Sequence, residues 1–329
     1  MTTQFPLPHE LIFEPSHTFE SGQVFRWSPI GNQKQEWLGV VSGRILKVSK
    51  SVVSLLGEDR KLKESTEELV KRFFSLGDDL EEISLSFPKD PYLDSALSQF
   101  SGLRLLTQDP WECLVSFLCS INCNIPSIRA KIENLCLKFG RKIETDLNIE
   151  AYSFPEASAL ATAKKHELLA CKLGFRWKYV SFLAKLIASG QLDLKSLSSL
   201  GYREARELLI SEISGNTFGV GPKIADCLLL FSSRKLEAFP IDVWILRCIR
   251  ENYSQLLPHG GDQNRPQGFP EHLSLSMYLR LGDNLRSYFG KYAGYAQQYL
   301  YMKRRTEGQR PAVTPSLQIE RRLESQCRL

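Results

Sequence analysis

The sequence predicts an α+β protein, in which an N-terminal antiparallel β-sheet domain is followed by an all-helical domain carrying a helix-hairpin-helix motif. Short runs rich in β-branched and aromatic residues, separated by turns that contain Gly or Asn, lie in the first 60 residues. From residue 109 onward, apolar residues recur mainly at helical spacing. At 329 residues the chain can bury a large core, and its length alone suggests two or three domains.

The predicted strands of the N-terminal part are residues 18–27, 37–41, 44–48 and 52–56. Ser42-Gly43 separates two of these runs and predicts a hairpin turn. Helical patterns follow at residues 66–74 and 92–100. We therefore expect an N-terminal α+β domain over residues 1–107.

The helical region begins with a strong start signal. Asp109 is a suitable N-cap, Pro110 suits the first helical position, and Glu112 at the third position predicts a capping box. Gly140 is a suitable stop for the next helix. Further helical patterns lie at residues 155–163, 167–171, 177–189, 194–198, 202–213, 222–231, 243–253, 271–289 and 293–303.

Two segments near the C-terminus lack a sustained helical pattern. Residues 259–270 are rich in Gly, Pro and polar residues and predict an exposed loop. The tail, residues 306–329, contains two prolines and many charges, and we expect it to be mobile apart from a short helix near residues 319–323. The helical domain is therefore expected to span residues 108–305.

A glycine-containing turn joins two of the predicted helices. Gly219-Val220-Gly221 precedes Pro222, which suits the first position of the second helix, so a helix-hairpin-helix is predicted over residues 204–232. The two glycines let the backbone turn tightly, and the free N–H groups can then grip an anion such as a DNA phosphate. A glycine turn between two helices is also common without any such function.

Lys223 and Asp242 are the candidate catalytic residues. Lys223 falls in the first turn of its helix, where the positive end of the helix dipole disfavours an ammonium and so favours the neutral amine. Asp242 follows after 242 − 223 = 19 residues and is predicted to be the N-cap of the next helix. The ordinary alternatives are a solvated lysine and a simple capping aspartate.

Composition and charge favour a soluble intracellular protein. The formal net charge of +5, with pI ≈ 8.7, fits contact with nucleic acid without requiring it. The eight cysteines form no C-x-x-C pair and predict free thiols in a reducing compartment, and the five histidines show no metal-ligand spacing. The first basic residue is Arg26, so a secretory signal is not expected, and no apolar run approaches the ~20 residues that span a bilayer.

Several motifs in the same order carry a resemblance to a known family. They are SGQVFRW at residues 21–27, QDPWECLVSFLCSINCNI at 108–125, KLGFRWKYV at 172–180, GVGPKIADC at 219–227, FPIDV at 239–243 and YAGYAQ at 292–297. The chain resembles the helix-hairpin-helix Gly/Pro…Asp base-excision DNA glycosylases, and among them it is most similar to the 8-oxoguanine DNA glycosylase/AP lyases. The resemblance implies an antiparallel sheet near the N-terminus and excision of oxidised purine in base excision repair.

The resemblance also implies roles for individual residues. Lys223 would attack C1′ of the sugar and form a Schiff base that permits β-elimination, while Asp242 would stabilise the cationic sugar. The flipped base would lie in a pocket made by Gly22, whose carbonyl meets N7–H of 8-oxoguanine, by Gln297 at the Watson–Crick edge, by Cys227 and Tyr301 on the two faces, and by Phe231 one turn beyond Cys227. The DNA-facing residues would be Asn122, Phe175, Arg176, Gly219, Gly221 and Trp244, with Asn122 filling the space left by the base and Arg176 reading the estranged cytosine.

The residues themselves leave simpler interpretations open. A cysteine in an apolar helix, such as Cys227, is more often simply a core residue, and the alternatives for Gly22 and Gln297 are a hairpin glycine and a surface glutamine. The sequence also departs from its relatives. Ser127 stands where the family usually has a second arginine that reads cytosine, and Phe175 replaces the usual wedge tyrosine; Trp244 replaces a histidine and Cys123 an asparagine. We therefore expect a weaker preference for cytosine opposite the lesion.

Two other functions remain open at this stage: a glycosylase of the same fold for another damaged purine, such as an alkylated one, and a helix-hairpin-helix DNA-binding protein without catalysis. An iron–sulfur cluster of the kind found in a related branch is excluded, because only Cys248 and Cys327 follow Asp242. We expect no cofactor, no metal and no membrane contact. The expected partner is double-stranded DNA containing 8-oxoguanine, bound by a monomer in the nucleoid or cytoplasm of a bacterium or in the nucleus of a eukaryote.

Overall fold

The computed structural model describes residues 3–31, 33–59, 64–147, 149–214, 219–258 and 273–308. The predicted loop at 259–270, the predicted short helix at 319–323 and Cys327 lie outside these residues. Within them, no helix combines the length and the apolar character needed to cross a membrane.

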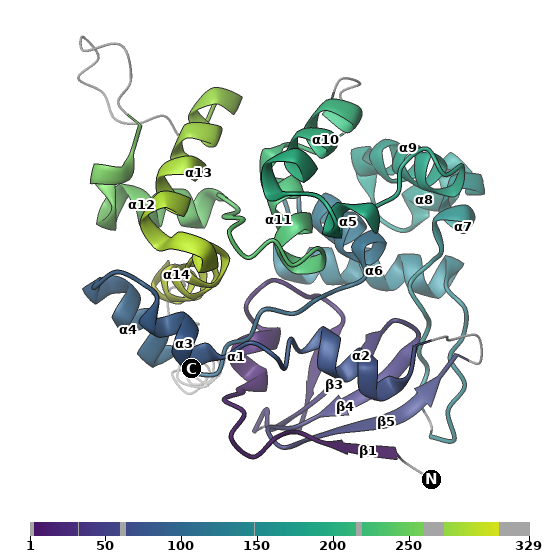
Figure 1. Ribbon diagram of the computed structural model, residues 1–329. Coiled ribbons are helices and arrows are strands. Elements are labelled where there is room, and N and C mark those ends of the chain that lie inside the picture. Colours follow the sequence, from purple (N-terminus) through teal and green to yellow (C-terminus); the bar gives the residue numbers. More distant parts are fainter. Residues whose placement is uncertain are drawn as a thin grey trace, which may run out of the picture.

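An antiparallel sheet forms the N-terminal part, as predicted (Figure 1). Its strand order is β1-β5-β4-β3-β2. The turn between β3 and β4 has positive φ at both Ser42 (46°) and Gly43 (77°), the backbone that a tight hairpin requires. The strands are β1 (Thr3–Pro6), β2 (Trp27–Ile30), β3 (Glu36–Val41), β4 (Arg44–Val48) and β5 (Val52–Glu58).

The strand predicted over residues 18–27 is wrong. Residues 18 and 19 end helix α1 (Pro15–Phe19), which Glu14 caps and whose first turn contains Pro15, and β2 begins only at Trp27. The intervening turn is held by Gln23, which donates to Thr18 O (3.2 Å) and Arg104 O (2.9 Å) and accepts from Leu106 N (2.8 Å). These side-chain bonds replace the ladder of a strand.

The apolar residues divide between two main cores. Helix α2 (Thr66–Phe73) covers the sheet and packs Leu69 and Phe73 against Trp27 and Trp37. Helices α3 (Leu80–Leu85) and α4 (Pro91–Gln99) instead add Ile83, Leu93 and Ala96 to the core of the helical body, and α4 packs on the C-terminal helix. The segment before the predicted boundary at residue 107 therefore contributes to both cores.

Arg104 connects several segments of the N-terminal part. Its side chain is 1% exposed, and it donates to the carbonyls of Phe74 (3.1 Å), Ile12 (3.1 Å), Ser75 (2.7 Å) and Asp78 (2.7 Å). A buried charge of this kind is tolerated because its donors are occupied.

The helical body consists of two groups of helices (Figure 1). Helix α11 packs against α5, α10 and α13, and α12 packs against α14. One group comprises α5 (Pro110–Cys119), α6 (Ile125–Phe139), α7 (Ala157–Thr162), α8 (Lys165–Ala170), α9 (Trp177–Ala188), α10 (Tyr202–Ser214) and α11 (Pro222–Ser232), and the other comprises α12 (Val243–Asn252), α13 (Leu275–Phe289) and α14 (Ala293–Gly308).

The start of α5 differs in one detail from the prediction. Asp109 is the N-cap and accepts from Trp111 N and Glu112 N, both at 3.0 Å. The Glu112 carboxylate, however, lies 3.6 Å from Arg26 Nη1 instead of completing the predicted capping box. Burial raises the pKa of Glu112 to about 7, which the Arg26 charge opposes.

A glycine allows α14 to lie close to α11. A Cβ on Gly294 would come within 2.2 Å of Leu230 Cδ1, and Gly294 N donates to Leu236 O at 2.7 Å. This contact brings the side chains of α14 next to the helix that carries Lys223.

Candidate active site

The predicted glycine hairpin leads directly into α11. Gly219 has a φ of +82°, whereas Gly221 is extended (φ −80°, ψ 175°) and is the N-cap of the helix. No side chain caps this helix start, and Pro222 occupies the first turn. No side-chain cap therefore competes for the peptide N–H groups at this helix start.

Lys223 lies in the first turn of α11 and is half-buried. Its Nζ is 4.9 Å from the centroid of the Phe117 ring, which belongs to α5. The amine is therefore held over an aromatic face at the edge of the core rather than extended into solvent.

Asp242 is the N-cap of α12, as predicted. One carboxylate oxygen, Oδ1, accepts from Trp244 N (2.9 Å) and Ile245 N (2.8 Å). Burial raises the pKa of Asp242, while the Lys223 charge and these backbone bonds oppose the rise. The two predicted catalytic side chains therefore belong to different helices, and the charge of Lys223 acts to lower the pKa of the Asp242 carboxyl.

Cys227 and Phe231 follow Lys223 along α11 and are both buried. Burial raises the pKa of the Cys227 thiol to about 12, and the charges of Lys223 and Asp242 both act on it. Cys227 therefore belongs to the same group as the two candidate catalytic residues. Phe231 stacks on Phe117 with ring centroids 5.5 Å apart, which places it in the core behind that ring.

Gly22 and Tyr301, two of the predicted base-pocket residues, lie next to each other. Gly22 has a φ of +76°, and a Cβ there would lie 3.0 Å from the Tyr301 hydroxyl. Burial, with a smaller effect of the Asp242 charge, raises the pKa of Tyr301 to about 12. A hollow of about 360 Å³ opens beside Gly22, lined also by Pro126, Arg129, Met302 and Arg305, but Cys227, Gln297 and Tyr301 do not line it.

Gln297 is buried on α14 rather than exposed on the surface. Its Nε2 donates to Pro240 O at 3.2 Å, two residues before Asp242. Its Oε1 is buried, and the described residues offer it no hydrogen-bond partner. An acceptor of this kind is suited to a donor on a ligand.

Asn122 lies at the turn between α5 and α6, exposed and with a φ of +48°. Arg176 is 6% exposed and holds this turn: it donates to Ile121 O and to Cys123 Sγ (3.2 Å). In this structure the Arg176 guanidinium therefore contacts the backbone beside Asn122, and its Nε has no partner among the described residues.

Phe175 and the hairpin belong to one continuous surface. The Phe175 side chain is 49% exposed, lies 4.4 Å from the Arg176 guanidinium and makes an edge contact with Tyr179 at 6.0 Å. A Cβ on Gly219 would come within 2.6 Å of the Tyr179 ring. Tyr179, four residues after Phe175 and thus on the same helix face, connects Phe175 to the hairpin.

The structure adds residues that sequence reasoning missed. Tyr179 was detectable from its spacing to Phe175, and Phe117 lies on the helix of a quoted motif, but neither was selected. Lys131 is buried on α6 and donates to Ser127 Oγ at 2.6 Å, a contact that the sequence pattern does not reveal.

Trp244, one of the predicted DNA-facing residues, lies against Gly308 at the end of α14, where a Cβ would come within 2.4 Å of its ring.

The cysteines and acidic residues of the described part make no metal centre. No group of three or more His, Cys, Asp or Glu side chains able to hold a metal occurs among them. The cysteines of this part are free thiols.

The chain is similar to several known proteins. Residues 5–114 match the model of the 8-oxoguanine DNA glycosylase N-terminal domain family. A probable N-glycosylase/DNA lyase of Methanothermobacter thermautotrophicus is 30% identical over 262 residues, covering 73% of this chain and 75% of the relative. An N-glycosylase/DNA lyase of Arabidopsis thaliana is 29% identical over 295 residues, covering 87% and 75%.

A solved structure gives the same result. It is the 8-oxoguanine glycosylase/lyase of Clostridium acetobutylicum, in complex with double-stranded DNA containing cytosine opposite 8-oxoguanine. The TM-score is 0.75 at 29% identity, and the match covers 94% of this chain and 99% of that one. The chain therefore belongs to the 8-oxoguanine DNA glycosylase/lyase family and is an N-glycosylase/DNA lyase.

Proposed function

We propose that this protein excises 8-oxoguanine from double-stranded DNA in base excision repair, with Lys223 as nucleophile and Asp242 as the stabilising carboxylate. The observation that carries the proposal is the placement of the two side chains: Lys223 lies in the first turn of α11 with its Nζ 4.9 Å from the centroid of the Phe117 ring, and Asp242 is the N-cap of α12. We further propose that the protein binds DNA containing the lesion as a monomer. It would act in the compartment that holds the DNA, which is the nucleoid or cytoplasm of a bacterium or the nucleus of a eukaryote.

The chemistry requires both side chains. Breaking the C1′–N bond creates a sugar with oxocarbenium character, which a nearby carboxylate stabilises. The neutral Lys223 amine bonds to C1′ as the base departs, and ring opening gives a protonated Schiff base. Loss of a C2′ proton then expels the 3′ phosphate, so that one lysine supports both the glycosylase and the lyase steps.

The extruded base is proposed to enter between Cys227 and Tyr301. Gly22 has no side chain to block the approach beside Tyr301, so its carbonyl can accept from N7–H of 8-oxoguanine. Gln297 offers the unpaired Oε1 to a donor on the Watson–Crick edge. Phe231 supports this pocket from behind, through Phe117.

The surface formed by Asn122, Arg176, Phe175, Tyr179 and Gly219 is proposed to face DNA. Asn122 is exposed at the tip of a turn and can enter the space left by the base. Arg176 would have to exchange its contact with Ile121 for base acceptors before it reads the opposite strand. Trp244, at the start of α12, is proposed to contact the DNA backbone.

Lys223→Gln is expected to retain DNA binding and to lose excision by at least about 10³-fold, because the nucleophile is removed. Borohydride should cross-link the wild-type protein to a duplex containing 8-oxoguanine and should not cross-link the variant. A wild-type protein that binds the duplex without any cross-link would instead support a non-catalytic DNA-binding protein or a glycosylase that activates water.

Asp242→Asn is expected to lower excision by at least about 10²-fold and to stabilise the protein at neutral pH. Asn still caps α12, but it carries no buried charge. Because the folded pKa of Asp242 is raised above 3.8, wild-type stability should fall relative to the variant as pH rises from 3.8 through that raised pKa. Thermal unfolding at several pH values measures the difference in stability between the wild-type protein and the variant. A difference that does not change with pH would contradict a raised pKa of Asp242.

The two hairpin glycines provide a matched pair of variants. A Cβ on Gly221 would lie within 4 Å of no other atom, and the φ of −80° is allowed for alanine, so we expect Gly221→Ala to leave the folding stability unchanged. We expect weaker DNA binding, because the added methyl group obstructs the phosphate. Gly219→Ala requires a positive φ and collides with Tyr179, and it should cost roughly 1–3 kcal/mol of folding stability. Urea unfolding and DNA titration by fluorescence anisotropy separate the two effects; full DNA affinity of Gly221→Ala would argue against phosphate binding there.

The preference for cytosine opposite the lesion is expected to be weak. The Ser127 side chain is short and already accepts from Lys131, so it does not supply a long donor to the opposite base. Excision rates with all four opposite bases measure this preference, and Ser127→Arg should increase the advantage of cytosine. A strong cytosine preference in the wild-type protein would refute the expectation.

A further inference from the structure

A buried carboxylate lies three residues after Lys223. Asp226 is completely buried on α11 and accepts from the Tyr202 hydroxyl (2.7 Å, Oδ1) and from the Tyr278 hydroxyl (2.9 Å, Oδ2). Arg206 Nη1 is 4.0 Å from Oδ1. A buried charge is costly unless its partners are well placed, so this arrangement requires an explanation beyond packing.

One branch of this network reaches the backbone next to Asp242. Tyr278, on α13, donates to Asp226 and accepts from Ile241 N at 3.0 Å. Ile241 immediately precedes Asp242. A chain of two hydrogen bonds therefore connects α11, which carries Lys223, to the residue before the N-cap of α12.

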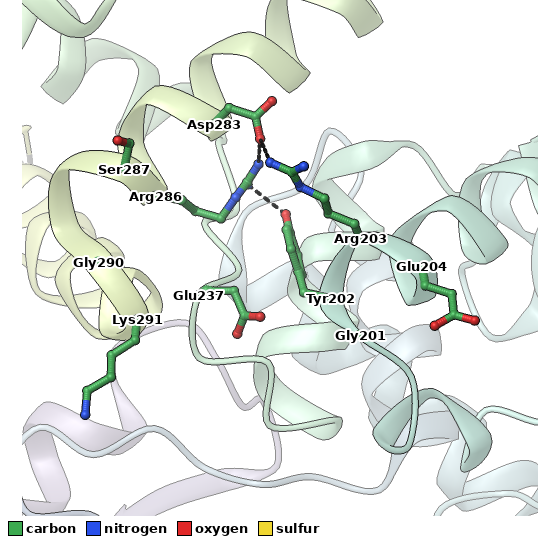
Figure 2. A pocket seen from close by; sticks show the side chains of 10 residues that line it. All are labelled: Gly201, Tyr202, Arg203, Glu204, Glu237, Asp283, Arg286, Ser287, Gly290 and Lys291. Carbon is green, nitrogen blue, oxygen red and sulfur yellow. Dashed lines mark hydrogen bonds and ion pairs between the residues drawn. The ribbon is translucent and has the colours of Figure 1, made fainter.

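The other branch leads away from the site. The Tyr202 hydroxyl accepts from Arg206 and Arg286, both at 2.8 Å, and Arg286 also pairs with Asp283. Figure 2 shows this end of the network at a hollow of about 660 Å³ between the start of α10 and the end of α13. The side chains around the hollow include both acidic and basic ones, so it does not favour a ligand of one charge.

We propose that Asp226 and Tyr278 are positioning residues that hold the Asp242 carboxylate in place relative to Lys223. The inference rests on the proposed roles of Lys223 and Asp242 in excision. Neither Asp226 nor Tyr278 is proposed to touch DNA. Their effect passes through α11 on one side and through the Ile241 peptide on the other.

Positioning residues are needed because the two proposed catalytic side chains do not share a helix. Lys223 and Asp242 lie on different helices, and small displacements between reacting groups have large effects on rate. Burial raises the pKa of Asp226 to about 6, against the effects of the Tyr202 bond and the Arg206 charge, so the carboxylate is mainly ionised at neutral pH. In that form it accepts from both tyrosines, and Tyr278 is left to accept from Ile241.

Tyr278→Phe and Tyr202→Phe test the inference as a matched pair. Each removes one hydroxyl from the same carboxylate, but only Tyr278 also contacts Ile241. The measurements are the single-turnover rate of 8-oxoguanine excision with saturating enzyme, corrected for the folded fraction, and the affinity for a duplex with a tetrahydrofuran abasic analogue. Tyr278→Phe should slow excision about tenfold or more at unchanged affinity, whereas Tyr202→Phe should lose stability and keep its rate.

Equal rates for the two variants, whether both lowered or both unchanged, would overturn the inference. Asp226→Asn is a second variant, in which one amide oxygen must serve two hydroxyl donors; it should also slow excision at unchanged affinity, and a wild-type rate would count against the proposal. If Tyr278→Phe does not fold, Asp226→Asn decides by that criterion. The failure of the proposed function is distinguishable, because it would appear as excision by Lys223→Gln.

Discussion

The candidate active site depends on one carboxylate that satisfies two requirements at once. Asp242 Oδ1 caps α12 by accepting from Trp244 N and Ile245 N, and these bonds fix the direction of the side chain. The same carboxylate interacts with Lys223 on α11. Because the capping bonds determine where the Asp242 charge lies, the start of α12 both stabilises the helix and positions a group with a proposed role in catalysis.

The packing of α11 explains how the position of Lys223 is fixed. The helix is buried from Ile224 to Ser232 and packs against α5, α10 and α13, so Lys223 in its first turn and Cys227 one turn later are held by a well-packed helix. Gly294 lets α14 approach, and with it Gln297 and Tyr301. A buried central helix thus places Lys223 next to the proposed base pocket, whose other side chains come from segments far apart in the sequence.

The sequence predicted those parts of the fold that depend on local signals. Strands β3 to β5, the Ser42-Gly43 turn and the helix starts at Asp109 and Asp242 were predicted because composition, turn residues and capping residues agree there. The strand at 18–27 was wrong because its aromatic composition outweighed the Glu14-Pro15 helix start, and the short, mostly exposed β1 was missed. The contacts of Asp226 with Tyr202 and Tyr278 span 24 and 52 residues, and no local pattern encodes them.

The two kinds of buried polar group in this protein suggest a division between folding and function. Arg104 is deeply buried and donates to four backbone carbonyls, as expected for a group that stabilises the fold. Gln297 Oε1 is equally inaccessible and has no partner among the described residues. An unpaired acceptor costs folding free energy in the free protein. Its position beside Pro240 and Tyr301 is explained if a donor on the extruded purine completes the hydrogen bond, so that this cost is offset only when the substrate base is bound.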